Sequence, residues 1–267
     1  MIKTLTKISF TALLLLSLTG CNNNKKENEF KASLPMPEWD KKAEMTVDGY
    51  IGNWHDAKKD PISATKIGYT YSEELKDYDK AIQWYKYSNS MKPMGENSNY
   101  MCYAYQMKKE YEEAIKWCKN AIELGNDEAL FRLGKVYELD KKYDNAISYY
   151  KKSVEKSHDK MAISNIGSSY YEKKDYKNAE LWYKKAIKDG NLESYQNIAT
   201  FYHEGLKNDI KASAYSIAVI NTKYTKRSVL KLLQNTWKIP NETIKKGYEL
   251  QLNSDEFPIK FKGELGL

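Results

Sequence analysis

A short motif that returns five times along the chain constrains its fold more than any other feature. Its clearest copy begins at Tyr143, reads Tyr-Asp-Asn-Ala-Ile-Ser-Tyr-Tyr and has Ala146 at its fourth position. Related copies have their alanines at Ala81, Ala114, Ala179 and Ala212, so successive alanines lie 33, 32, 33 and 33 residues apart. A period of about 34 residues indicates pairs of helices stacked into a solenoid.

A second pattern precedes each copy and predicts the first helix of each pair. An aliphatic residue, a small residue directly after it and a tyrosine three positions later share one helical face. The five sets are Ile67-Gly68-Tyr71, Met101-Cys102-Tyr105, Leu133-Gly134-Tyr137, Ile166-Gly167-Tyr170 and Ile198-Ala199-Tyr202. The small residue lets the second helix approach closely. We therefore expect an all-α fold, a right-handed α-solenoid of about five helix–turn–helix repeats over residues 62–222.

The ends of the solenoid are expected to be capped. Residues 39–61 hold scattered aromatic and aliphatic side chains and are predicted to cover the first repeat as an N-terminal cap or linker. From residue 223 the period stops, and residues 223–267 are predicted to form capping helices followed by an extended tail, because terminal units must shield the last repeat.

The first residues have the pattern of a secretory leader. Lys3 and Lys7 precede a short apolar run, and the run ends in Leu18-Thr19-Gly20-Cys21. This segment resembles the lipobox of bacterial lipoproteins, which implies a signal peptide at 1–20, acylation of the Cys21 thiol and a flexible tether over 21–38. Asn22 in place of aspartate favours the outer membrane, on its periplasmic side, with the cell membrane as the alternative.

The repeats resemble a known family. Residues 129–146 and 165–190 are similar to the tetratricopeptide repeat, and more closely to its Sel-one-like variant; residues 198–212 have the tyrosine, glycine and alanine spacing of that variant. The resemblance implies that ligands bind the concave surface lined by first helices. The Lys/Asn clamp that some of these proteins use for a peptide carboxylate is missing, so binding of chaperone tails is not expected.

Several function classes lack support in the sequence. The three histidines lie in separate segments, and no metal-binding, nucleophile-elbow or phosphate-loop motif is present. We expect no enzyme, no metal, no cofactor and no small-molecule substrate. Without Lys3 and Lys7 the net charge falls from +7 to +5 (41 minus 36), and no basic cluster stands out, which argues against nucleic acid.

Two cysteines remain besides Cys21. Cys102 lies at the small position of a first helix and Cys118 on the facing second helix, where we expect an offset of about one helical turn. The sequence favours two buried thiols that act as small apolar side chains. A disulfide between them, in an oxidising compartment, is the alternative.

The inner face supplies the candidate binding residues. The positions beside the packing residues are polar or aromatic with few charges, and tyrosine and phenylalanine there suit protein contact. The alternative is that these aromatics pack along the stack. The candidates are Tyr69, Asn99, Tyr103, Gln106, Phe131, Lys135, Ser168, Tyr171, Gln196 and His203.

We therefore expect a lipid-anchored, periplasm-facing protein that binds a protein partner on its concave face. The resemblance implies an adaptor or assembly factor, because lipoproteins with such repeats commonly scaffold outer-membrane or pilus assembly. The alternative that it implies is an immunity protein that neutralises a type VI secretion phospholipase-type effector. A neighbouring toxin gene would favour the second role.

Overall fold

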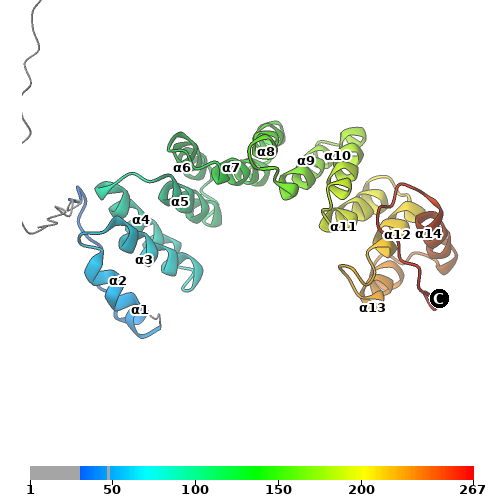
Figure 1. Cartoon of the computed structure of the whole chain (residues 1–267), viewed down its shortest axis with the longest axis horizontal. Coiled ribbons are helices and arrows are strands. Elements are labelled where there is room, and N and C mark those ends of the chain that lie inside the picture. Colours follow the sequence, from blue (N-terminus) through cyan, green and yellow to red (C-terminus); the bar gives the residue numbers. More distant parts are fainter. Residues whose placement is uncertain (1–30, 47–48) are drawn as a thin grey trace, which may run out of the picture.

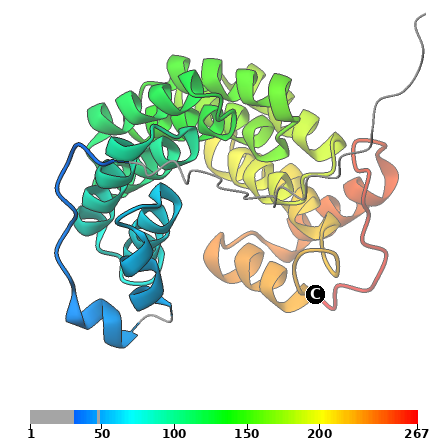
Figure 2. The same ribbon diagram turned by 60° about the vertical axis from the view of Figure 1, so that its left-hand side comes forward.

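The computed structural model describes residues 31–46 and 49–267, and in this part of the chain the fold is an α-solenoid. The expected leader at 1–20, the Cys21 acylation site and most of the tether lie outside the described residues. Two short helices, α1 (Lys41–Thr46) and α2 (Tyr50–Asp56), precede the stack. The helix pairs then follow one another along an arch (Figures 1 and 2).

Each expected repeat is an antiparallel pair of helices. The pairs are α3 (Pro61–Glu73) with α4 (Tyr78–Met91), α5 (Gly95–Met107) with α6 (Tyr111–Glu123), α7 (Glu128–Leu139) with α8 (Tyr143–Ser157), α9 (Lys160–Glu172) with α10 (Tyr176–Lys188), and α11 (Glu193–Thr200), continued by the π-helical turn η1 (Phe201–Gly205), with α12 (Asp209–Ala218).

Residues beyond 222 form a last pair of helical segments, which pack mainly on α12 rather than on each other. Helix α13 (Lys226–Leu230) continues into the π-helical turn η2 (Lys231–Thr236), and α14 (Asn241–Asn253) packs back against α12. The tail after α14 is extended and pairs with no strand among the described residues. Phe257 of the tail is 2% exposed. The side-chain amide of Gln251 donates to the Phe261 carbonyl at 2.7 Å and accepts from the Phe261 N–H at 3.0 Å.

The turn inside each pair has the same backbone geometry. One lysine per turn has φ between 53° and 63°: Lys76, Lys109, Lys141, Lys174, Lys207 and Lys238. The next backbone N–H donates, at 2.8 to 3.0 Å, to the carbonyl of the recurring tyrosine of the first helix, or of Leu233 in the last pair. Such a left-handed residue satisfies the free carbonyls at a helix end. Leu233 is thus the equivalent of the repeating tyrosine.

Glycines set the distance between the paired helices. A Cβ atom added to Gly68, Gly134 or Gly167 would lie 2.6 to 2.7 Å from the ring of Tyr85, Tyr150 or Tyr183 on the second helix. No side chain fits at that distance, so the ring packs directly on the glycine backbone. The buried side chains up to Ile166 form one core cluster, and those from Ala179 onward form two more.

The second repeat replaces this glycine–tyrosine pair with a disulfide. Cys102 and Cys118 are bonded, their Cα atoms are 5.1 Å apart, and both side chains are fully buried. The expectation of two separate thiols offset by a helical turn is therefore wrong. The two residues are 16 positions apart, as are Gly134 and Tyr150, so they occupy the point of closest helix contact.

The N-terminal helices are attached to the first repeat by a polar contact. The carboxylate of Asp40 accepts hydrogen bonds from the Tyr71 hydroxyl at 2.9 Å and the Lys80 ammonium at 2.5 Å. The Tyr50 hydroxyl lies 3.3 Å from that of Tyr71. The recurring tyrosine of the first repeat thereby becomes the docking point for the residues around α1 and α2.

Candidate functional site

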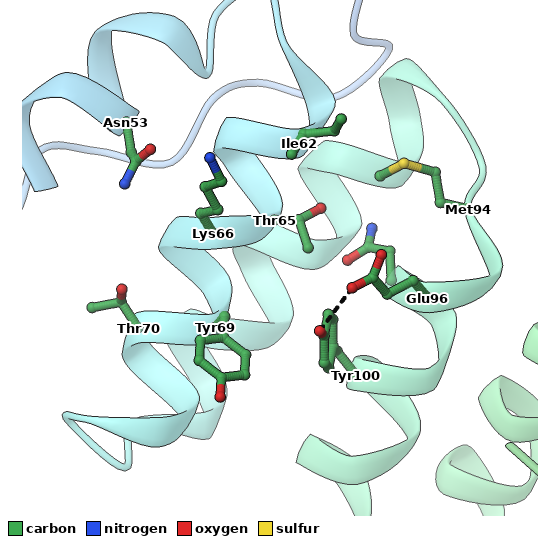
Figure 3. A pocket seen from close by; sticks show the side chains of 10 residues that line it. Asn53, Ile62, Thr65, Lys66, Tyr69, Thr70, Met94, Glu96 and Tyr100 are labelled. Atoms are coloured by element: carbon green, nitrogen blue, oxygen red, sulfur yellow. Dashed lines mark hydrogen bonds between the residues drawn. The ribbon is translucent and has the colours of Figure 1, made fainter. Parts of the chain in front are cut away.

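The inner side of the arch is lined by the first helices of the pairs, and its N-terminal half contains two clefts. The first is a cleft of about 390 Å³ between α3 and α5 (Figure 3). Tyr69 stands at its edge with 46% of its surface exposed, and its ring meets that of Tyr100 edge-on at 5.6 Å. The Tyr100 hydroxyl donates to Glu96 at 2.8 Å. Burial, together with Glu96, raises the pKa of Tyr100 to about 12.

The second cleft, of about 410 Å³, lies between α5, α7 and the end of α8. Gln106, Phe131 and Lys135 line it, which brings three predicted residues together. Lys135 pairs with Glu138 at 3.3 Å. The side-chain carbonyl of Gln106 is buried and has no hydrogen-bond partner among the described residues.

Arg132 is a partly buried cation that lines the second cleft beside Lys135. Its Nε donates to the Asn99 carbonyl at 2.8 Å, and its guanidinium lies 4.9 Å from the centre of the Tyr103 ring. Burial lowers the pKa of Arg132 below its ordinary value, and charges on Tyr103 and Glu128 act in the opposite direction. Within the described part of the chain no carboxylate lies within 4.0 Å of its nitrogens.

This arrangement gives Arg132 a fixed direction. The guanidinium fork is planar, and the Asn99 bond and the Tyr103 ring together constrain its plane. Only Nε is used, so the terminal N–H groups remain available to an acceptor on a ligand. Asn99 itself is 4% exposed and its side-chain carbonyl holds Arg132, while its predicted contact with a partner stays a prediction.

In the C-terminal half of the inner face, most of the predicted side chains contact other residues of the chain. Ser168 accepts a hydrogen bond from the Tyr183 hydroxyl at 3.1 Å, and Tyr171 packs edge-on against Phe201 at 5.9 Å. His203 stacks on Trp237 at 4.5 Å and bonds Asp209 at 2.7 Å. Gln196 is half-buried. Tyr171 and His203 thus contact neighbouring rings while remaining partly exposed, and their role in binding stays a prediction.

Two residues of the site were missed from the sequence. Arg132 and Tyr100 occupy equivalent places in successive first helices, one position beyond the predicted residues Phe131 and Asn99. Asn197 holds the same place in the fifth repeat and donates to Ser164 of the previous repeat at 2.9 Å, as Arg132 does to Asn99. Both residues were missed because the sequence was compared position by position within one repeat. The pairing of equivalent positions in neighbouring repeats would have pointed to them.

Two further properties concern the described residues alone. None of their helices combines the length and the apolarity that crossing a bilayer requires. No cluster of three or more histidine, cysteine or carboxylate side chains with the geometry to hold a metal ion occurs within 31–46 and 49–267.

Family models recognise the repeats one by one. Tetratricopeptide repeats match residues 63–93, 127–155 and 162–188, and a Sel1 repeat matches residues 94–126. The chain therefore carries tetratricopeptide and Sel1 repeats in its first four helix pairs. Such repeats commonly mediate protein–protein interaction and are typically not catalytic.

Solved structures show the same fold at low sequence identity. A protective antigen of uropathogenic Escherichia coli with an SLR fold is 21% identical, with a TM-score of 0.52, and the match covers 76% of this chain and 47% of that one. This chain thus spans about half the length of that antigen. Pseudomonas aeruginosa pilF is 14% identical with a TM-score of 0.55, and the match covers 77% of this chain and 96% of that one.

A third structure extends the likeness. The C-terminal part of a TPR repeat-containing protein from Cytophaga hutchinsonii is 17% identical with a TM-score of 0.55, over 80% of this chain and 92% of that one. No curated protein matches the sequence. At these identities the solved structures show that the fold is a repeat solenoid. They do not identify a partner of this chain.

Proposed function

We propose that this chain is a lipid-anchored, periplasm-facing protein that captures a protein partner in the inner clefts between α3 and α8. The repeats support the binding role, since a curved stack of helix pairs offers an extended concave surface. The apolar leader that ends in Leu18-Thr19-Gly20-Cys21 supports the anchor. An adaptor or assembly factor is the role that combines the two.

The observation that carries the proposal is that Arg132 is held in place but has no carboxylate partner among the described residues. Arginine is the cation that recognises carboxylates in two-point geometry, and it is enriched at the energetic centres of interfaces. A sheltered guanidinium without a carboxylate loses solvation and receives no ion pair in return. A partner that supplied an acceptor here would restore that loss, which favours binding at this point.

The tyrosines around Arg132 support a polypeptide as the ligand. Tyr69 is exposed, Tyr100 and Tyr103 are half-buried, and all three border the same inner surface. Tyrosine gives a large contact area with few rotatable bonds and keeps a hydroxyl for hydrogen bonding. Two clefts side by side suit consecutive side chains of one bound segment.

Affinity capture from membranes tests the proposal. We expect the tagged full chain to retain a partner, and the double variant Tyr69→Ala/Arg132→Gln to lose most of it. The matched control is Leu181→Ala/Lys116→Gln, on the exposed surface of the second helices α10 and α6, where Leu181 is 62% exposed. Equal capture by both variants would contradict a role for the inner clefts.

The captured partner also decides between the two roles. A component of outer-membrane or pilus assembly would identify an assembly factor, whereas a phospholipase-type effector would identify an immunity protein. Replacement of Cys21 by serine tests the anchor, since we expect the variant to leave the membrane fraction. Retention of the Cys21→Ser variant in that fraction would contradict lipidation.

A further inference from the structure

The last helix pair has an unbalanced charge. Between Asp209 and Glu242 the sequence has no aspartate or glutamate, yet it has Lys211, Lys223, Lys226, Arg227, Lys231 and Lys238. Sequence reasoning found no basic cluster because lysine and glutamate alternate through the rest of the chain. This stretch, which includes the whole of α13 and η2, departs from that alternation.

Some cations elsewhere in the stack are held between two carboxylates. Lys108 lies 2.6 Å from Asp79 and 2.7 Å from Glu110, and Lys184 lies 2.6 Å from both Glu180 and Glu256. No carboxylate of the described residues comes within 4.0 Å of Lys226, Arg227, Lys231 or Lys238. The cations of α13 and η2 therefore form no ion pair with the described residues.

These cations surround a hollow. A groove of about 810 Å³ is lined on one side by Lys226, Arg227, Leu230, Lys231, Gln234 and Asn235, and on the other by Leu265 and Gly266 of the tail. The Lys226 ammonium donates to the backbone carbonyl of Glu264 at 3.0 Å, which joins the two sides. We refer to this hollow as the basic groove.

We propose that the basic groove is a second binding surface of this protein, and that it takes an acidic segment of a polypeptide. Three cationic side chains on one wall are complementary to consecutive carboxylates. Gln234 and Asn235 add amide groups for the backbone of an extended segment. Figures 1 and 2 show α13 at the inner side of one end of the arch, so a partner lying in the arch can reach it.

A membrane surface fits the groove less well. A helix that lies in the bilayer interface turns a row of apolar side chains outward. Here Val229 and Leu233 are 3% and 0% exposed and face the core, so α13 and η2 present charged and polar groups to solvent. A hollow between a helix and the tail also accommodates a chain better than a flat plane of headgroups.

The test measures binding of a fluorescent oligoglutamate peptide to the purified full chain. The triple variant Lys226→Gln/Arg227→Gln/Lys231→Gln removes the cations of the groove. The control Lys116→Gln/Lys119→Gln/Lys156→Gln removes three exposed lysines from α6 and α8 and changes the net charge equally. We expect the groove variant to bind about tenfold more weakly and the control to stay within about twofold of the unmodified chain.

Other results would overturn the inference. Equal weakening in both variants would mean that net charge alone attracts the peptide. Unchanged affinity in the groove variant, with the same urea midpoint, would exclude the groove. Phosphatidylglycerol vesicles that bind through these three residues, when the peptide does not, would assign the surface to a membrane. The single variant Arg227→Gln is expected to weaken binding by about threefold. It keeps the test valid if the triple variant fails to fold.

Discussion

Cys102 and Cys118 occupy, in the second repeat, the two places at which neighbouring repeats set a glycine against a tyrosine ring. In the third and fourth repeats these places hold Gly134 with Tyr150 and Gly167 with Tyr183. The covalent bond and the ring packing are thus two solutions to one requirement, the close approach of first and second helices at the centre of each repeat.

Loss of the disulfide is expected to destabilise the solenoid. The bond closes a loop with a sequence separation of 16, for which the chain-entropy model gives about 3 kcal/mol. Cys102→Ser/Cys118→Ser should lower the free energy of unfolding, measured by urea denaturation, by about 2–4 kcal/mol. A reducing agent should destabilise the unmodified chain and leave the variant unchanged. Equal midpoints for all of these samples would contradict the pairing.

Enlarging the glycine at the helix contact is expected to destabilise a repeat. Gly134→Leu places a side chain where a single Cβ would already lie 2.6 Å from the Tyr150 ring, which should cost on the order of 1–3 kcal/mol or more. The control is Gly52→Ala in α2, where nothing lies within 4 Å of the added Cβ. Helix propensity predicts that this control gains up to about 1 kcal/mol. Similar losses in both would refute the packing argument.

Acid is expected to release the N-terminal helices. The Lys80 ammonium, with the Tyr71 hydroxyl, lowers the pKa of Asp40 to about 2. Because the folded pKa lies below the unfolded value of about 3.9, the contribution of Asp40 to stability is complete above pH 4 and is lost as the pH falls toward 2. Fluorescence of Trp39 and Trp54, which lie 4.9 Å apart beside this contact, should report the change.

Replacement of Asp40 provides the comparison. Asp40→Asn should already be weakened at neutral pH, by on the order of 1 kcal/mol because Lys80 is partly exposed, and should lack the transition between pH 4 and 2. Asp79→Asn, at a carboxylate that is 73% exposed, should behave like the unmodified chain. A transition that persists in Asp40→Asn would assign it to another group.

Arg132 is expected to act in binding through its fork as well as its charge. Arg132→Lys keeps the charge but loses the planar donors and the bond from Nε to Asn99, so partner affinity should fall nearly as far as in Arg132→Gln, by about tenfold. Calorimetry with the captured partner measures the difference. Full retention by Arg132→Lys would mean that charge alone suffices, and the proposed geometry would then be wrong.

The sequence predicted the fold well because its repeating positions are packing positions. The tyrosines, small residues and alanines placed the helices of the first five pairs, as the solenoid and the matched repeats confirm. The last pair was not predicted as a repeat, because Leu233 replaces the tyrosine and the alanine motif is absent. It shares the turn geometry of the repeats at Lys238, but α14 packs on α12.

The candidate site was harder to predict, because its key contacts join residues of different repeats. The bond between Arg132 and Asn99 connects residues 33 positions apart. His203 was expected on the inner face without a contact to residues beyond 222, but its ring stacks on that of Trp237. The disulfide could have been anticipated from the spacing between glycine and tyrosine in the third and fourth repeats.

Site-specific photocrosslinking in cells tests the central claim most directly. A benzoylphenylalanine at position 69 places the crosslinker at the first inner cleft, and one at position 181 places it on the exposed surface of α10. The account predicts a specific protein adduct from position 69 and none from position 181. An adduct from position 181 alone would show that the partner binds the second helices, and would contradict capture by the inner face.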